Sequence, residues 1–249
     1  MKGSLKHLAV GAAGLACLVG VAGCEEAMPV GKVGLGAGVE YESAKMADGA
    51  GYHVVTIRLD TPGLRLFVTP KDEGMKRVGM EYRLARVQSE GDWAIGMTLA
   101  SEDGDLSWVD SNSRAFWFDE QNRLTVERER PPWKIGEGPD GRSECRLAVG
   151  GYAFSCIDGE LNKWVDKQPD RVTLMGATAD RGVLMLAVFD RAGMLDATRV
   201  LMERGARDVM MLDGGDSTAM SVRIPGSARP AVVLRGRPVA THFGVRVER

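Results

Sequence analysis

The sequence predicts one α+β domain built on a mixed sheet, rich in strands and with a few helices. Its 249 residues, 44% hydrophobic and 27% charged, are typical of a single globular domain. From residue 52 onward, short apolar or alternating runs separated by turn residues predict strands. Only residues 79–91 and 196–208 favour helices. The formal charge of −2 lacks the basic excess of nucleic-acid-binding proteins, so no nucleic-acid partner is expected.

The N-terminus predicts export. Lys2 and Lys6 precede an apolar stretch over residues 8–23, which is short for a membrane span of about 20 residues. The following "VAGC" resembles a bacterial lipobox, so residues 1–23 are expected to be a lipoprotein signal peptide and Cys24 to be lipidated. Glu25 does not resemble the aspartate signal for inner-membrane retention, so an outer-membrane lipoprotein that faces the periplasm is expected, bound to the lipid membrane by its acyl chains. An uncleaved anchor or an ordinary signal is the alternative.

Residues 24–51 are rich in Gly and Ala and lack sustained periodicity, which predicts a flexible tether before a domain over 52–249. Two cysteines, Cys145 and Cys156, remain in that domain. In an oxidising compartment this pair predicts a local disulfide, with two buried unpaired thiols as the alternative. Among the tryptophans, Trp133 lies in a polar loop and is the candidate for stacking on a sugar, whereas Trp164 is expected to be at least partly buried.

The strand predictions follow the turn signals. Residues 53–59 and 64–70 are expected to form a hairpin with its turn at 60–63, and residues 113–126 a second hairpin with its tip at 119–122. Residues 92–101, 172–179 and 182–190 read as buried strands, and two more are expected over 231–248.

A strand–helix–strand unit is predicted over residues 182–212. Asp196 suits the helix N-cap and Gly205 the C-terminal glycine position of helix 196–208. "VMML" then forms a buried strand, so the unit is a crossover that places "DGGDST", residues 213–218, at the end of its second strand. Ligands of α/β sheets bind beyond such strand ends.

The "DGGDST" segment combines groups suited to an anionic substrate. Gly214 and Gly215 permit positive φ and leave the backbone N–H groups open to an anion. Asp213 leaves a buried strand, where a carboxyl group can serve as general acid or base. Asp216, Ser217 and Thr218 add an acceptor and two hydroxyls. The alternative is a plain turn in which Asp213 caps backbone N–H groups.

The segment "ARDVMMLDGGDSTAM" resembles the N-L-D-G-G-G-S-S/T signature of the phosphodiester glycosidase family, and "VTLMGATADRGVLMLAVFDRAG" and "GRPVATHFGV" are similar to its flanking motifs. The resemblance implies that family's fold and hydrolysis of a sugar-1-phosphodiester or related glycosidic linkage, with a carbohydrate or sugar-phosphate substrate. It implies Asp213 as the catalytic acid or base and Asp190 as the second carboxylate. The implied substrate contacts are Gly214, Gly215, Asp216, Ser217, Thr218 and Arg237.

The chain departs from the family pattern at several polar positions. Met211, Asp216, Gly96, Met97, Val172 and Thr241 replace family residues. These losses favour the alternative of a catalytically degenerate domain that binds envelope glycans or a protein partner. His242 is a candidate base or phosphate contact, with a buried strand residue as the alternative. No cofactor is known from the resemblance, but a divalent cation could bind near Asp213 and Asp216, whose charges would otherwise repel an anion.

Overall fold

The computed structural model describes residues 30–68, 93–96, 114–127, 146–165, 168–227, 230–239 and 242–248. The expected signal peptide, the helix over 79–91 and several single residues lie outside these ranges: Cys24, Met97, Trp133, Cys145 and Thr241. No helix in the described ranges is long and apolar enough to span a bilayer.

The described chain is mostly β, which corrects the α+β prediction towards strands. Its one α-helix is α2 (Met194–Met202). The remaining helical turns are the short 3₁₀ segments η3 (Lys163–Val165) and η4 (Gly215–Ser217). Strand-rich character and the helix near residue 196 are therefore confirmed.

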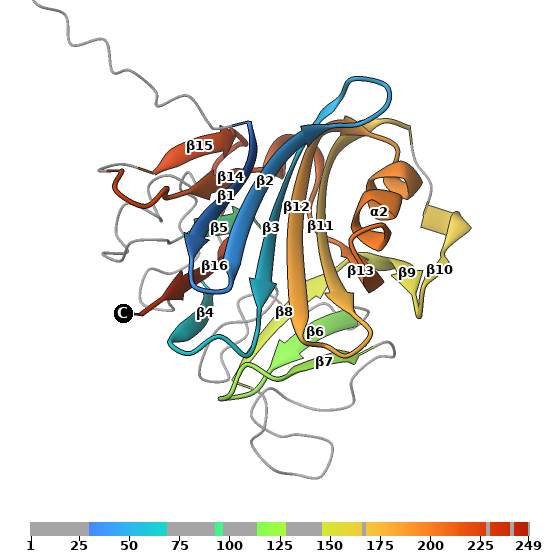
Figure 1. Ribbon diagram of the computed structural model, residues 1–249. Coiled ribbons are helices and arrows are strands. Elements are labelled where there is room, and N and C mark those ends of the chain that lie inside the picture. The colour runs from blue at the N-terminus through green and yellow to red at the C-terminus, as the bar shows by residue number, and fades with distance from the viewer. Residues whose placement is uncertain are drawn as a thin grey trace, which may run out of the picture.

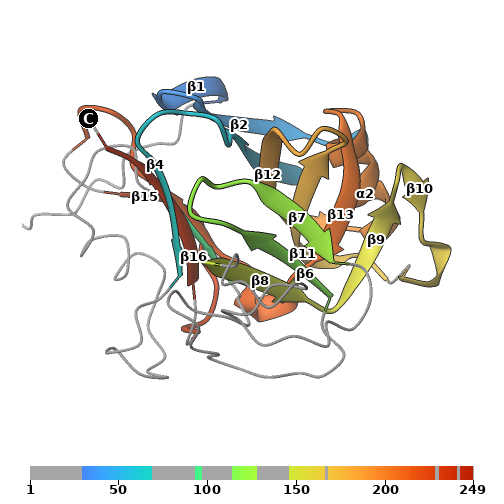
Figure 2. The same ribbon diagram turned by 90° about the horizontal axis from the view of Figure 1, so that it is seen from below.

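The described residues form three sheets in which all strand pairs are antiparallel (Figures 1 and 2), so the prediction of a single mixed sheet is wrong. The largest has the order β1-β2-β3-β12-β11-β13-β9-β10. Its strands are β1 (Gly31–Gly36), β2 (Val39–Lys45), β3 (Gly51–Arg58), β9 (Ala153–Ile157), β10 (Glu160–Leu161), β11 (Asp170–Thr178), β12 (Val183–Ala192) and β13 (Ala206–Met211). The five-stranded sheet, in the order β15-β14-β5-β16-β4, contains β4 (Leu64–Val68), β5 (Trp93–Gly96), β14 (Met220–Val222), β15 (Ala231–Leu234) and β16 (His242–Val247). The three-stranded sheet, in the order β7-β6-β8, contains β6 (Arg114–Phe118), β7 (Leu124–Glu127) and β8 (Leu147–Gly151).

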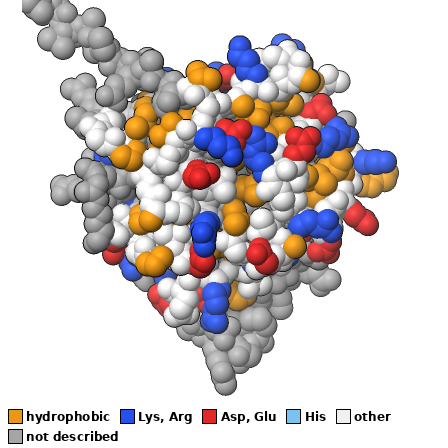
Figure 3. Space-filling model, viewed as in Figure 1, with side chains coloured by type: hydrophobic (Ala, Val, Ile, Leu, Met, Phe, Trp, Pro, Cys, Tyr) orange, Lys and Arg blue, Asp and Glu red, His pale blue; other side chains and the backbone are white. Residues whose placement is uncertain are grey.

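The central strands of the largest sheet are buried on both faces, whereas the outward face of β1 and β2 is largely exposed, and charged side chains are spread over the side of the molecule seen in Figure 3. Successive side chains of a strand point to opposite faces, so Leu186 and Met210 enter a core shared with the other two sheets, while Ala187 and Val209 enter a second core. Helix α2 covers this second core, into which Leu201 inserts (Figure 1). Burial on both faces explains why β11, β12 and β13 read as continuous apolar runs.

The predicted crossover is confirmed. Strands β12 and β13 both pair antiparallel with β11, so they run parallel to each other on either side of it. Helix α2 connects them across β11. Residue 213 therefore follows directly on the end of β13, as the sequence predicts. Asp196 is not the N-cap, because α2 begins at Met194 with Gly193 in that position, but Gly205 has the positive φ of 97° expected after the helix.

The predicted tether is wrong for residues 31–45, which form β1 and β2 at the edge of the largest sheet. Leu35, Val39 and Tyr41 are buried, and their neighbours are mostly exposed. The glycines of β1 conceal this alternation in the sequence. Among described residues the domain thus begins near Gly31 rather than at residue 52.

The predicted hairpin around residues 60–63 is also wrong. Strands β3 and β4 belong to different sheets, and the turn carries the chain from one to the other. Gly63 has a φ of 76°, which confirms a turn at this position. The residues of a turn do not, however, specify which strands pair. The second hairpin, β6–β7, is confirmed. Its tip is organised by Asp119, whose Oδ1 accepts the backbone N–H groups of residues 121 and 123.

The predicted disulfide is wrong, because Cys156 is a free buried thiol. It lies in β9 opposite Val209, within the core under α2. Its Sγ donates to the Arg207 carbonyl at 3.3 Å. Burial is the main cause that raises the pKa of this thiol.

Candidate functional site

The "DGGDST" segment turns away from the sheet directly after β13. The Leu212 N–H donates to the Thr173 carbonyl at 3.0 Å, which continues the strand pairing by one residue. A Cβ on Gly214 would lie 2.9 Å from the Arg171 carbonyl oxygen, and Gly215 has a φ of 57°. Both glycines are therefore required, the first by close backbone approach and the second by conformation.

Asp213 lies against Arg237, a pairing within the predicted site. Arg237 Nη2 is 3.9 Å from Asp213 Oδ2, and the Asp213 side chain is 24% exposed. Arg237 Nε donates to Ser217 Oγ at 2.8 Å, and the Arg237 backbone N–H donates to the Asp216 carbonyl at 2.6 Å. Four predicted residues, Asp213, Asp216, Ser217 and Arg237, are thus brought together from two segments of the chain.

The segment that carries Arg237 is fixed over η4. A Cβ on Gly236 would lie 2.6 Å from the Thr218 carbonyl and 2.9 Å from that of Asp216. Arg171 Nη1, from β11, donates to the Arg235 carbonyl at 3.1 Å. These contacts hold the Arg237 segment beside the end of β13.

Tyr152 completes the surroundings of Asp213, and the sequence offered no signal for it. Its phenol lies near enough to Asp213 for the carboxylate charge to act on it. Its backbone N–H donates to the Met211 carbonyl at 2.9 Å. Burial raises the pKa of Tyr152, and the Asp213 charge adds to this while Arg237 opposes it. Gly151 permits the approach, since a Cβ there would lie 2.3 Å from the Met211 carbonyl.

Thr218 and His242 are internal residues. Thr218 is fully buried, and its hydroxyl is bonded to that of Thr173 at 3.1 Å. This bond ties the segment after η4 to β11. His242 is 2% exposed and pairs with Gly96 inside the five-stranded sheet, which agrees with the alternative of a buried strand residue. Met211 also points into the core under α2 and does not obstruct Asp213.

Asp190 does not pair with Asp213. It lies at the end of β12, and β11 separates β12 from β13, so the two backbones are about 10 Å apart. Asp190 Oδ2 would be 3.1 Å from a Cβ on Gly51. Burial lowers the pKa of the neighbouring His53 and the Asp190 charge opposes this. His53 Nδ1 in turn is 2.8 Å from the Tyr41 hydroxyl.

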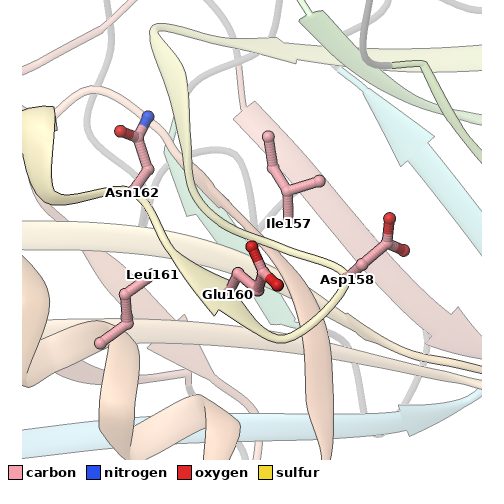
Figure 4. A pocket seen from close by; sticks show the side chains of 5 residues that line it. All are labelled: Ile157, Asp158, Glu160, Leu161 and Asn162. Atoms are coloured by element: carbon pink, nitrogen blue, oxygen red, sulfur yellow. The ribbon is translucent and has the colours of Figure 1, made fainter.

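The described residues contain no group of three or more His, Cys, Asp or Glu side chains arranged to hold a metal. A cation held by Asp213 and Asp216 stays a prediction. A hollow of about 430 Å³ lies elsewhere, on the β9–β10 hairpin (Figure 4). It is lined by Ile157, Asp158, Glu160, Leu161 and Asn162.

Comparison with known proteins decides the family. The sequence profile of the phosphodiester glycosidases matches residues 85–246, more than half of the chain. The chain belongs to the phosphodiester glycosidase family. A search of curated proteins finds no match. The match includes the "DGGDST" segment, Tyr152 and Arg237, so the residues gathered around Asp213 all lie within the phosphodiester glycosidase region.

Solved structures show the same fold. The catalytic domain of zebrafish N-acetylglucosamine-1-phosphodiester alpha-N-acetylglucosaminidase, auto-inhibited by its pro-peptide, superposes with a TM-score of 0.57 at 12% identity, over 89% of this chain and 87% of that one. A hypothetical protein from Synechocystis gives a TM-score of 0.51 at 12% identity, over 90% of this chain and 64% of that one. At such identities the similarity supports the phosphodiester glycosidase fold alone.

Proposed function

We propose that this domain hydrolyses a sugar-1-phosphodiester or a related glycosidic linkage in the bacterial cell envelope, held at the outer membrane through lipidated Cys24. The observation that carries the proposal is the ion pair of Asp213, in the family signature, with Arg237. A carboxylate that accepts protons and a cation that binds phosphate are thereby placed side by side.

Asp213 is assigned as the general base. Its ion-pair partner Arg237 carries only N–H donors, so Asp213 is the member of this pair that can accept a proton. In the reaction, Asp213 removes a proton from water while the water oxygen bonds to the anomeric carbon. The bond between that carbon and the phosphate oxygen breaks, and its electron pair leaves with the phosphate. The products are the free sugar and a phosphomonoester.

Arg237 is assigned to the leaving phosphate. A phosphomonoester leaves as an anion, so the transition state needs a positive charge at the leaving oxygen more than it needs a proton. Arg237 is 58% exposed and already oriented by Ser217 and by the backbone of Asp216. This assignment explains how one carboxylate can suffice, although glycosidases usually use a close pair.

The sugar class follows from a relative. The zebrafish enzyme of the same fold is named for action on an N-acetylglucosamine-1-phosphodiester. Its reaction type agrees with the Asp213–Arg237 arrangement, so an N-acetylglucosamine-1-phosphodiester is the first substrate to try.

A second candidate function is glycan binding without turnover. Two observations favour it: the Asp190 carboxylate lies beside Gly51 of β3, on the side of β12 away from β13, and Asp216 adds a negative charge on the segment where the phosphate would bind. A divalent cation near Asp213 and Asp216 would offset this charge, so chelation with EDTA belongs in the assay.

The test is hydrolysis of a panel of sugar-1-phosphodiesters by the domain and by Asp213→Asn. We expect the substitution to lower kcat by about 10²–10⁴-fold. Asp196→Asn is the matched control, because Asp196 is exposed on α2 and should leave turnover unchanged. Equal activity of the wild type and Asp213→Asn would refute the assignment. Absence of turnover in folded wild-type protein would favour the binding function.

A further inference from the structure

Trp164 is the most exposed large hydrophobic residue in the described chain, at 97%, which corrects the expectation of partial burial. Its neighbour Val165 is buried in the core under α2, so η3 is fixed against the sheet while the indole stays outside. The Trp164 backbone N–H donates to Asn162 Oδ1 at 3.2 Å. An indole held in solvent by a fixed backbone forgoes a large burial energy, which favours a ligand for it.

The chain returns from β10 towards the site. The Asn162 backbone N–H donates to the Ser155 carbonyl at 2.9 Å, and Asn162 Nδ2 donates to the Phe154 carbonyl at 3.0 Å. Residues 162–165 therefore run back along β9, towards Tyr152 at its start. Tyr152 is itself 67% exposed.

Asp213, Tyr152 and Trp164 thus belong to three neighbouring segments at one end of the sheet. Tyr152 adjoins the end of β13 through its bond to the Met211 carbonyl, and η3 follows on the other side of β9. In the sheet, β10 is two strands from β13, and η3 continues from β10 towards the end of β9 that adjoins Tyr152. The two exposed aromatic residues therefore extend outward from Asp213.

We propose that Tyr152 and Trp164 form an aromatic platform on which successive rings of an oligosaccharide stack, so that the substrate is a glycan chain rather than a single sugar phosphate. This inference rests on the proposed function, because it supplies the substrate class of that same site. Pyranose rings present flat C–H faces, and these pack on aromatic rings while their hydroxyls remain solvated.

The hollow on the β9–β10 hairpin extends the platform. Asn162 lines it (Figure 4). Asn162 Oδ1 also accepts the backbone N–H of Trp164. The exposed carboxylates of Asp158 and Glu160 offer acceptors for sugar hydroxyls.

The test measures calorimetric binding of the N-acetylglucosamine monomer and of its β-1,4-linked tetramer to Asp213→Asn protein, which separates binding from turnover. We expect the tetramer to bind about three- to tenfold more tightly than the monomer for each additional stacked ring. Adding Trp164→Ala should remove this gain and leave the monomer unaffected. Trp164→Phe should retain most of it.

Tyr152→Phe separates the two roles of Tyr152. It keeps the ring, so tetramer affinity should persist, while loss of the hydroxyl should slow hydrolysis of a sugar-1-phosphodiester in protein with intact Asp213. Both Trp164 and Tyr152 variants should melt at the wild-type temperature, because both side chains are exposed.

The platform is refuted if the tetramer does not bind, binds no better than the monomer, or is indifferent to Trp164→Ala. It is also refuted if Trp164→Ala weakens binding to vesicles of equal parts phosphatidylethanolamine and phosphatidylglycerol but not to the tetramer. Tetramer binding that depends on Trp164, without any hydrolysis, would refute the proposed function and leave the platform. Hydrolysis whose rate does not depend on the length of the glycan chain would refute the platform and leave the proposed function.

Discussion

Gly214→Ala should damage both stability and turnover, because the added methyl group meets backbone. The new Cβ would lie 2.9 Å from the Arg171 carbonyl oxygen, about 0.5 Å closer than an ordinary contact. The "DGGDST" segment lies beyond the last paired residue of β13, whereas Arg171 precedes residues of β11 that pair with β12, so we expect the segment to move. Overpacking of this kind costs about 1–2 kcal/mol, which lowers Tm by about 3–6 °C in a domain of this size.

The same displacement should lower kcat about tenfold, since a shift of about 1 Å at a catalytic group costs up to about 10² in rate. The assays are thermal unfolding followed by circular dichroism and hydrolysis of the best sugar-1-phosphodiester. Gly34→Ala is the control, because a Cβ there meets no atom within 4 Å and its φ is not positive. We would abandon the close-approach argument if Gly214→Ala matched Gly34→Ala in both Tm and rate.

Three further predictions concern stability and the thiol. Arg181→Ala should destabilise the domain by about 3 kcal/mol, because it removes the ion pair between Arg181 and the fully buried Asp208. Urea unfolding measures the change in the free energy of unfolding, and a loss below half of that value would contradict the prediction. The pKa of His53 is lowered in the folded state, so the unfolded state binds more protons and stability should fall as the pH drops through 6.5. Urea unfolding at pH 7.5 and 5.5 should show a smaller loss of unfolding free energy in His53→Gln than in the wild type. Equal losses would contradict the assignment. Alkylation under denaturing conditions without reductant should modify Cys156; mass spectrometry that finds it linked to Cys145 would contradict the free thiol.

The sequence was most informative where its residues are buried on both sides. Strands β11, β12 and β13 carry continuous apolar runs, and α2 carries helical periodicity, so their order and the position of Asp213 follow from pattern alone. The two glycines after Asp213 are meaningful in the sequence because few other residues fit a positive φ or a carbonyl at 2.9 Å. Arg237 could be assigned to the site only through the family resemblance, because no sequence pattern relates residue 237 to residue 213.

The failures arose where pairing depends on distant segments. The turn at 60–63 has hairpin chemistry, but packing against the common core decides that β3 and β4 enter different sheets. Asp190 and Asp213 both follow apolar strands, and only the interposed β11 separates them. Tyr152 reaches Asp213 through strand pairing between β9 and β13, which leaves no mark on the sequence around either residue.

The early start of β1 limits how far the domain could travel. Six residues, 25–30, separate Cys24 from Gly31. Even fully extended, this stretch would span only about 25 Å. If Cys24 carries the proposed acyl chains, the catalytic body would be confined to a shell about one domain diameter deep above the lipid headgroups. Its substrates would then be glycans displayed near that surface, delivered by lateral diffusion in the bilayer more than by diffusion through the periplasm.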